Sequence, residues 1–375
     1  MKPRARRLGA AARIAAGLLL AAAALAPATA AAAGAPDDGW RLKLHSQQHS
    51  DATALNLGRD PQAGDLAPRP GRNLAYIDDE VRVQRQAGSW NFGLLARSRA
   101  TLVASADTLA LYQQVDGGAP ISADRRWSVE ARFRGFSGGG LVVGREHGLG
   151  AGWSAHWQVQ ALVLQRWRER RISGTVGASL ASGEYDFALT STQRDDRLRF
   201  PFQSAYPSRG AAMLGDLSLA WQGQRWRFEA TVKDAGWQHW RALPRQDAVL
   251  DSRTAAFDAD GFLIYRPLIQ GQNAQPTATQ AAAAWGRLAA GWQPAATPGV
   301  TWEAGGDVLP GFGLLPWLGL RAGVGASQLA LQWRTHERRL TLHWQWQGLT
   351  LTAGADRLGA GSRSRELGLA WRLRI

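Results

Sequence analysis

The residues most able to act on a solute are arginines and glutamates that recur at every second position. Glu130, Arg132 and Arg134 follow this spacing, and so do Arg227 and Glu229. Residues two apart in an extended strand lie on one face, so a curved sheet gathers them on one surface. Rings of arginine favour anions; the alternative is an Arg–Glu ladder that fills the interior without transport. The candidate lumen-lining residues are Arg82, Glu130, Arg132, Arg134, Arg227, Glu229, Arg334, Arg372 and Arg374.

Covalent or metal chemistry has less support in the sequence. Ser154 and His156 are two apart, which is ordinary strand alternation, whereas nucleophilic catalysis needs a base in contact with the nucleophile. His45, His49 and Asp51 offer ligand atoms, but their spacing on a strand that runs into a loop has no metal geometry behind it. The chain contains no cysteine and no glycine-rich phosphate loop. We therefore expect no cofactor, no metal and no enzymatic activity.

The stretch 363–375, RSRELGLAWRLRI, shows what kind of element carries such residues. Trp371 and its aliphatic neighbours at every second position alternate with polar residues, so one strand face is apolar and the other charged. This stretch resembles the closing strand of bacterial outer-membrane β-barrel proteins of the porin-like class. In that class the barrel-assembly machinery reads the strand, and its last residue is usually Phe or Trp, whereas here it is Ile375.

The first 35 residues have the pattern of a secretory signal peptide. A basic start precedes an apolar run over residues 14–25, and small residues follow. The run is shorter than the roughly 20 apolar residues that a membrane-spanning helix needs. We therefore predict a cleaved signal peptide at 1–35, with cleavage between Ala30 and Ala35, and a barrel domain over 36–375.

Composition agrees with a barrel. Hydrophobic residues make up 45% of the chain, yet the mean hydropathy is −0.26, so apolar residues are spread by alternation. The 43 glycines and 18 tryptophans fit the same class. The formal charge of +14 would suit nucleic acid, but an exported chain without a compact basic motif argues against that, and we expect no nucleic-acid partner.

The alternating segments predict an all-β, antiparallel transmembrane β-barrel of about 16 strands (range 14–18). The glycine run 138–140 and the charged stretch 168–171 are expected to interrupt strands, 105–125 is expected to be a loop, and 237–282 is the least regular region. The alternative is a soluble β-sandwich or β-helix in the periplasm. Tryptophans at segment ends favour a membrane, where they form interfacial girdles; these are Trp167, Trp221, Trp226, Trp344 and Trp346.

These observations predict a protein of the Gram-negative outer membrane. Its expected role is a channel or exporter for hydrophilic, preferably anionic solutes, an acidic polysaccharide among them. The first alternative is a non-enzymatic barrel that supports envelope or exopolysaccharide assembly, and the second is a barrel enzyme acting on lipid. The expected partners are outer-membrane lipid, lipopolysaccharide and, through residues 363–375, the barrel-assembly machinery.

Overall fold

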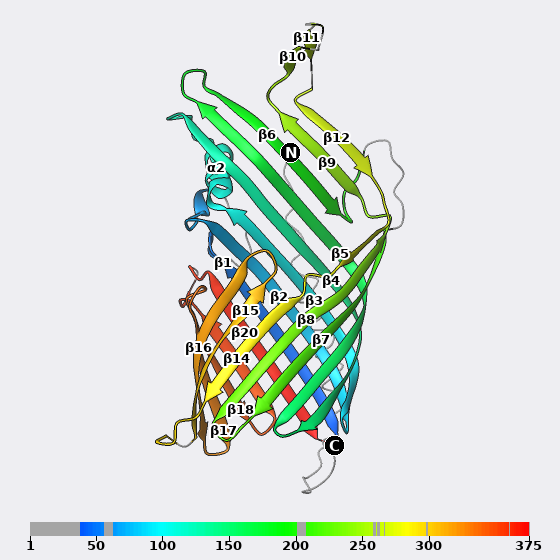
Figure 1. The fold of residues 1–375 in the computed structure, drawn as a ribbon, viewed down its shortest axis with the longest axis vertical. Helices are drawn as coiled ribbons and strands as arrows, with labels where there is room; N and C mark the ends of the chain where they lie inside the picture. Colours follow the sequence, from blue (N-terminus) through cyan, green and yellow to red (C-terminus); the bar gives the residue numbers. More distant parts are fainter. Residues whose placement is uncertain are drawn as a thin grey trace.

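A closed ring of antiparallel strands forms the body of the molecule (Figure 1). The computed structural model describes residues 38–55, 63–200, 208–257, 260, 263–265, 267–297, 299–359 and 361–374. The predicted signal peptide (1–35) and Ile375 lie outside these residues. Within the described part, the ring has 14 strands. In ring order they are β1 (Gly39–Ser50), β2 (Arg72–Ala87), β3 (Trp90–Ser105), β4 (Arg125–Gly150), β5 (Trp153–Ser179), β7 (Arg209–Gln222), β8 (Trp226–Arg241), β14 (Trp285–Trp292), β15 (Val300–Leu309), β16 (Gly313–Val324), β17 (Ser327–Arg334), β18 (Arg339–Trp346), β19 (Leu349–Ala355) and β20 (Ser364–Arg374).

The ring closes because β1 pairs with β2 along one edge and with β20 along the other. Arg41, for example, lies opposite Gln84 on β2 and opposite Arg372 on β20. Closure leaves no unpaired sheet edge in a bilayer, where each unpaired backbone group would cost several kcal/mol. The predicted antiparallel barrel is confirmed; the preferred count of 16 is wrong, and 14 lies at the lower limit of the predicted range.

The count was too high because part of the sheet lies outside the ring. β4 and β5 are 26 and 27 residues long, more than twice what a bilayer crossing needs, and they continue beyond the barrel on one side (Figure 1). There the far half of β5 pairs with β6, β6 with β9, and β9 with β12, while β13 pairs with the end of β8. A separate hairpin joins β10 and β11. The bounds of these strands are β6 Glu184–Asp195, β9 Arg245–Asp251, β10 Ala255–Phe257, β11 Leu263–Tyr265, β12 Ile269–Ala274 and β13 Ala278–Ala281.

Both expected interruptions in the long strands are wrong. The glycine run 138–140 lies inside β4, where glycine is needed because β5 approaches closely: a Cβ on Gly140 would lie 1.9 Å from the Ala161 carbonyl oxygen. The charged stretch 168–171 lies inside β5 and pairs with β4 on one side and β6 on the other. This part of β5 continues beyond the membrane-spanning part of the barrel, so charged side chains are tolerated there.

Two short helices lie in the connections at the end of the barrel opposite the two-residue turns. The expected loop 105–125 contains α2 (Ala106–Asp116), and η1 (Ala63–Asp65) precedes β2. Ser105 caps α2 by accepting a hydrogen bond from the Thr108 amide. In the described part of the chain, no helix is long and apolar enough to cross a membrane.

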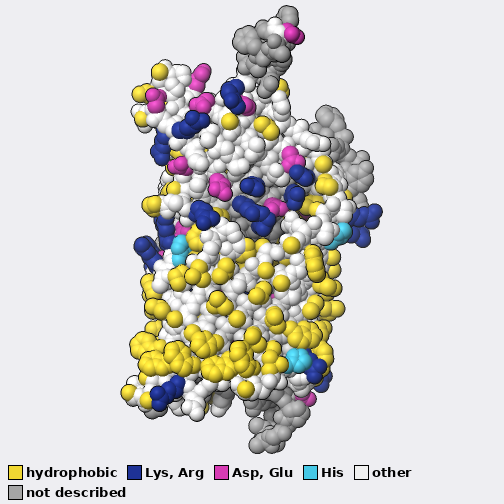
Figure 2. All heavy atoms as spheres, viewed as in Figure 1, with side chains coloured by type: hydrophobic (Ala, Val, Ile, Leu, Met, Phe, Trp, Pro, Cys, Tyr) yellow, Lys and Arg dark blue, Asp and Glu magenta, His cyan; other side chains and the backbone are white. Residues whose placement is uncertain are grey.

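The outer wall carries an apolar belt. Figure 2 shows hydrophobic side chains gathered around the lower part of the molecule, with charged side chains mostly above them. The predicted tryptophan girdle is present at the lower edge, but Trp167 is not part of it, because it is buried inside the barrel. The exposed tryptophans near the strand ends at that edge are Trp40, Trp90, Trp153, Trp226, Trp292, Trp302, Trp346 and Trp371.

The two ends of the ring differ in their connections. Four turns at the girdle end have two residues each, at 88–89, 151–152, 325–326 and 347–348. In the last of these, Gln347 and Gly348 both have positive φ, as the twist of a tight hairpin requires. Outer-membrane barrels place short turns in the periplasm and longer loops outside the cell. The closed ring and its apolar belt confirm the predicted barrel of the bacterial outer membrane.

Candidate functional site in the barrel interior

Charged side chains from opposite walls bridge the middle of the barrel interior. Arg97 and Arg99 of β3 both donate hydrogen bonds to Asp234 of β8, with Arg97 Nη1 2.6 Å from Oδ1. Arg99 also donates to Asp78 of β2 at 3.0 Å, and its guanidinium lies 3.9 Å from the ring centroid of Trp285 on β14. Because β4, β5 and β7 stand between β3 and β8 in the ring, these contacts cross the lumen.

The side chains of Arg97, Arg99, Asp234 and Trp285 form a block across the lumen, and an apolar cluster packs against Trp285. Leu74 and Tyr76 of β2 pack with Leu309 of β15 and Leu315 of β16, although β2 and β15 stand on opposite walls of the ring. Burying a side chain of this size contributes about 1.5–3 kcal/mol, so the filled interior is favourable. A second inward-facing cluster fills the side formed by β3–β8; its members are Leu95, Val142, Leu162, Leu164, Trp167, Ala212, Leu214, Trp240 and Leu243.

A polar cavity of about 270 Å³ lies on the short-turn side of the block. Arg227 and Arg321 both contact Glu303 there, at 3.3 and 2.9 Å. The predicted pair Arg227 and Glu229 lines this cavity. Its acidic and basic residues balance in number, since three arginines face three glutamates: Arg227, Arg287, Arg321, Glu229, Glu303 and Glu366.

A second cavity, of about 160 Å³, lies on the long-loop side of the block. The predicted residues Glu130, Arg132 and Arg134 line it together with Arg72, so three arginines face one glutamate. Glu169 of β5 accepts a hydrogen bond from Arg134 Nε at 3.0 Å and lies 3.7 Å from Arg132. A narrower space of about 50 Å³, which shares Arg134 with this cavity, is lined by Asp234 and Trp285 of the block.

The other predicted residues lie in different surroundings. Arg82 is buried and donates to Gln158 at 2.7 Å and to Glu80 at 2.8 Å. Arg334 is buried against Asp307, 2.6 Å away. The last two sit at the short-turn end of β20: Arg372 is partly exposed, and Arg374 pairs through its backbone with Gly39, its side chain lying outside the described residues.

Sequence reasoning missed the residues of the block itself. Arg97 and Arg99 are two apart and so carry the same signal as Arg132 and Arg134. The strand over these positions is predicted from its apolar face, and that interpretation leaves the arginines of the opposite face unassigned. Asp234 could not be placed, because it interrupts the pairing of β7 with β8, where the register shifts between Gly215 and Leu217.

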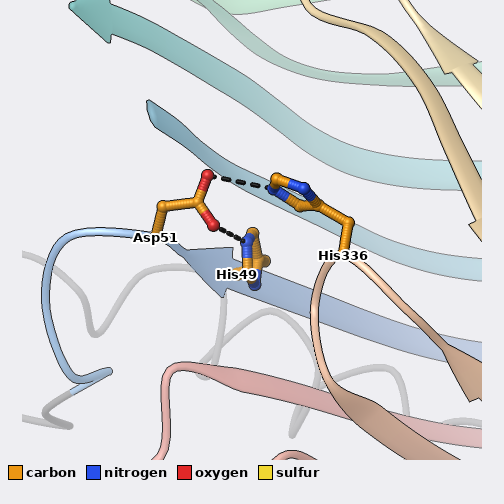
Figure 3. Close-up of side chains that lie close together, drawn as sticks. All are labelled: His49, Asp51 and His336. Carbon is orange, nitrogen blue, oxygen red and sulfur yellow. Dashed lines mark hydrogen bonds and ion pairs between the residues drawn. The ribbon is translucent and has the colours of Figure 1, made fainter. Parts of the chain in front are cut away.

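A second cluster of titratable groups lies at the long-loop rim (Figure 3). His49 and His336 each place Nε2 3.0 Å from a carboxylate oxygen of Asp51, which also forms an ion pair with Arg69 at 2.7 Å. Burial raises the pKa of Asp51, but hydrogen bonds from His336 and His49 outweigh it and hold the pKa below its ordinary value. The expected neighbour His45 is not part of this cluster.

These rim residues offer three metal-ligand atoms within 4.8 Å of one another. However, the Asp51 carboxylate already accepts hydrogen bonds from two imidazoles, a guanidinium and the Leu74 amide. A dication there would lie beside the Arg69 charge. The arrangement therefore suits a tether that joins the loop after β1 to the turn after β17. His336 is 285 positions from Asp51, so no spacing in the sequence could have revealed it.

No protein-family model matches the sequence, and no curated protein does. Several solved outer-membrane barrels share the general architecture at low identity. They include the toluene transporter TodX of P. putida (10% identity, 91% of each chain, TM-score 0.35), the outer-membrane protease OmpT of Escherichia coli (8%, 92% of this chain and 100% of that one, 0.27) and the translocator domain of the autotransporter NalP of Neisseria meningitidis (11%, 98% and 97%, 0.29). A transporter, a protease and a translocator domain do not distinguish one function from another, and the fold rests on the strand pairing above.

Proposed function

We propose that this barrel is a passage for hydrophilic solutes across the outer membrane, held closed by the block of Arg97, Arg99, Asp234 and Trp285. One observation carries the proposal: cavities of about 270 and 160 Å³, both lined by charged residues, lie inside the ring on the two sides of the block. In the part of the chain that the structure describes, side chains of the block lie between them, and side chains can rearrange without breaking the strand pairing of the ring. A ring of this size is wide enough for an aqueous path once those side chains move.

We place the selection of ions at the cavity on the long-loop side, because the two cavities differ in the charge of their lining residues. The cavity on the short-turn side has equal numbers of arginines and glutamates. The cavity on the long-loop side is lined by three arginines and one glutamate, and with Glu169, which pairs with Arg134 and Arg132, arginines still outnumber glutamates there by three to two. Fixed positive charge at a mouth raises the local concentration of anions. Arg132 and Arg134 are therefore the residues that favour anionic solutes, small ions or an acidic polysaccharide, while Arg227 and Glu229 are neutral to selection.

Planar-bilayer conductance of the purified full chain tests the passage. The variant R99A/W285A removes two of the four side chains of the block, and we expect its unitary conductance to rise several-fold above that of the wild type. The matched control is W292A, on the same strand but on the lipid-facing wall, which should leave conductance unchanged. If neither variant conducts, the passage is rejected in favour of the non-enzymatic scaffold for envelope or exopolysaccharide assembly.

Ion preference is measured in the open variant. Adding R132E and R134E should move the reversal potential towards cation selectivity, and adding R227Q and E229Q, which leaves the net charge unaltered, should not. An unmoved reversal potential in the first case would reject the role given to Arg132 and Arg134. Release of fatty acid from outer-membrane lipid by the purified protein, lost in H336A, would instead favour the lipid-acting enzyme.

A further inference from the structure

The outer face of β5 changes from apolar to basic at a single irregularity. Val163 points to the outside and is 68% exposed, while its neighbours Leu162 and Leu164 are buried. Gln165 has no partner on β4, because Ser137 pairs with Arg166 and Gly138 with Leu164. This bulge shifts the alternation by one residue. Trp167 consequently points inward, and the outer face continues as Arg166, Arg168 and Arg170.

The outer faces of β7 and β8, the next two strands of the ring, also change from apolar to basic near this level. Arg209 of β7 lies directly opposite Arg241 of β8, and both are exposed. They face outward, because the adjacent residue Trp240 is buried in the interior cluster. Just nearer the girdle, Met213 and Trp237 are 58% and 65% exposed on the lipid-facing wall. Pairing of β5 with β7 ends at Leu164 and Gly210, so Arg209 and Arg241 lie next to the start of the arginine run on β5.

Within the described residues, carboxylates form ion pairs with two of these five arginines. Arg166 pairs with Asp195 and Asp196 at 3.1 and 3.0 Å, and Arg168 lies 3.4 Å from Asp195. Among the described residues, none forms a hydrogen bond or ion pair with the side chain of Arg170, Arg209 or Arg241. Burial and the nearby charges of Arg168 and Arg166 lower the pKa of the Arg170 guanidinium. Like charges directly opposite in a sheet destabilise it, so an anion bound between Arg209 and Arg241 would relieve their repulsion.

We propose that Arg166, Arg168, Arg170, Arg209 and Arg241 bind the phosphate groups of a lipid in the outer leaflet. Arginine pairs with phosphate through two parallel hydrogen bonds, and the exposed Val163, Met213 and Trp237 directly below offer a wall for the acyl chains of the same molecule. The neighbourhood of an apolar wall selects an amphiphile over a free anion. This site is separate from the barrel interior and does not depend on the proposed passage.

Binding of bisphosphorylated lipid A to the detergent-purified full chain tests this site, with the titrated lipid read by native mass spectrometry. We expect R209Q/R241Q to bind the lipid about tenfold more weakly than the wild type, as expected for lost charge-assisted hydrogen bonds, and R170Q to weaken it independently. The matched control is R85Q, an exposed outward arginine at the short-turn end, which should bind as the wild type does. Heat-modifiable migration on gels verifies that each variant is folded.

Two comparison ligands complete the test. The same lipid with both phosphates removed should bind all variants alike and weakly, and inorganic phosphate alone should not compete at millimolar concentration. Equal affinity of the wild type and both arginine variants for the phosphorylated lipid would overturn the site. So would equal affinity for the phosphate-free lipid, or competition by inorganic phosphate, which would make the ligand a free anion.

Discussion

Replacing Asp234 by asparagine tests whether ion pairs hold the interior block together. The Asp234 side chain is 2% exposed, and those of Arg97 and Arg99 are 4% and 6% exposed. Asparagine keeps the shape and tolerates the positive φ of 62° at this position, so the change removes charge without adding backbone strain. Among the described residues, Asp78 is then the one carboxylate left in an ion pair with these two buried guanidiniums, and Arg97 keeps its hydrogen bond to Gln160. Removing one partner of a buried ion pair costs about 3–5 kcal/mol, and we expect D234N to lower the free energy of unfolding by this amount.

The assay is urea unfolding of the full chain in lipid vesicles, followed by tryptophan fluorescence. The matched control is D247N, whose partner Arg245 lies 2.7 Å away in a pair that is 37% exposed on both sides. Exposed pairs contribute about 0.2–1 kcal/mol, so D247N should be nearly neutral. The reasoning fails if the two variants lose the same stability, or if D234N stays within about 1 kcal/mol of the wild type.

Two other changes have defined outcomes. G140A should sharply reduce the yield of heat-modifiable folded barrel, because its Cβ would lie 1.9 Å from a carbonyl oxygen of β5, whereas G148A, with nothing within 4 Å, should fold like the wild type. The lowered pKa of Asp51 means that its stabilisation is fully present above its unfolded value of about 3.9 and is lost as pH falls towards the folded value. The thermal midpoint of D51N should therefore lie below that of the wild type at pH 7, and the gap should shrink at pH 3; a constant gap would contradict the tether.

The sequence predicted the architecture wherever a strand is as long as the membrane is thick. Alternation with a period of two marks strands such as β18 and β20, and their lipid-facing and inward residues follow directly from it. The pattern could not give the strand count, because β4 and β5 extend far beyond the bilayer, and β5 becomes charged on both faces there. Nor could it find the sheet that leaves the ring, since those strands pair beside β5 and not with their neighbours around the barrel.

The candidate site was predictable in residue type but not in arrangement. Arg132, Arg134, Arg227 and Glu229 were identified by spacing, and they line two different cavities. The block between these cavities depends on contacts such as Arg97 to Asp234, 137 residues apart. Period-two patterns assign a side chain to a face, but which inward side chains meet depends on the shape of the closed ring.

The bulge at Gln165 links the interior with the outer surface. With unbroken alternation beyond Val163, Trp167 would face the outside, and Arg166 and Arg168 would point inward beside Arg134. Glu169 would turn outward with Trp167, so these arginines would have lost the carboxylate that pairs with Arg134. The apolar cluster would also lose its Trp167–Trp240 contact, whose ring centroids lie 6.0 Å apart. One unpaired residue therefore supplies an aromatic ring to the filled interior and turns basic side chains outward where the wall leaves the apolar belt.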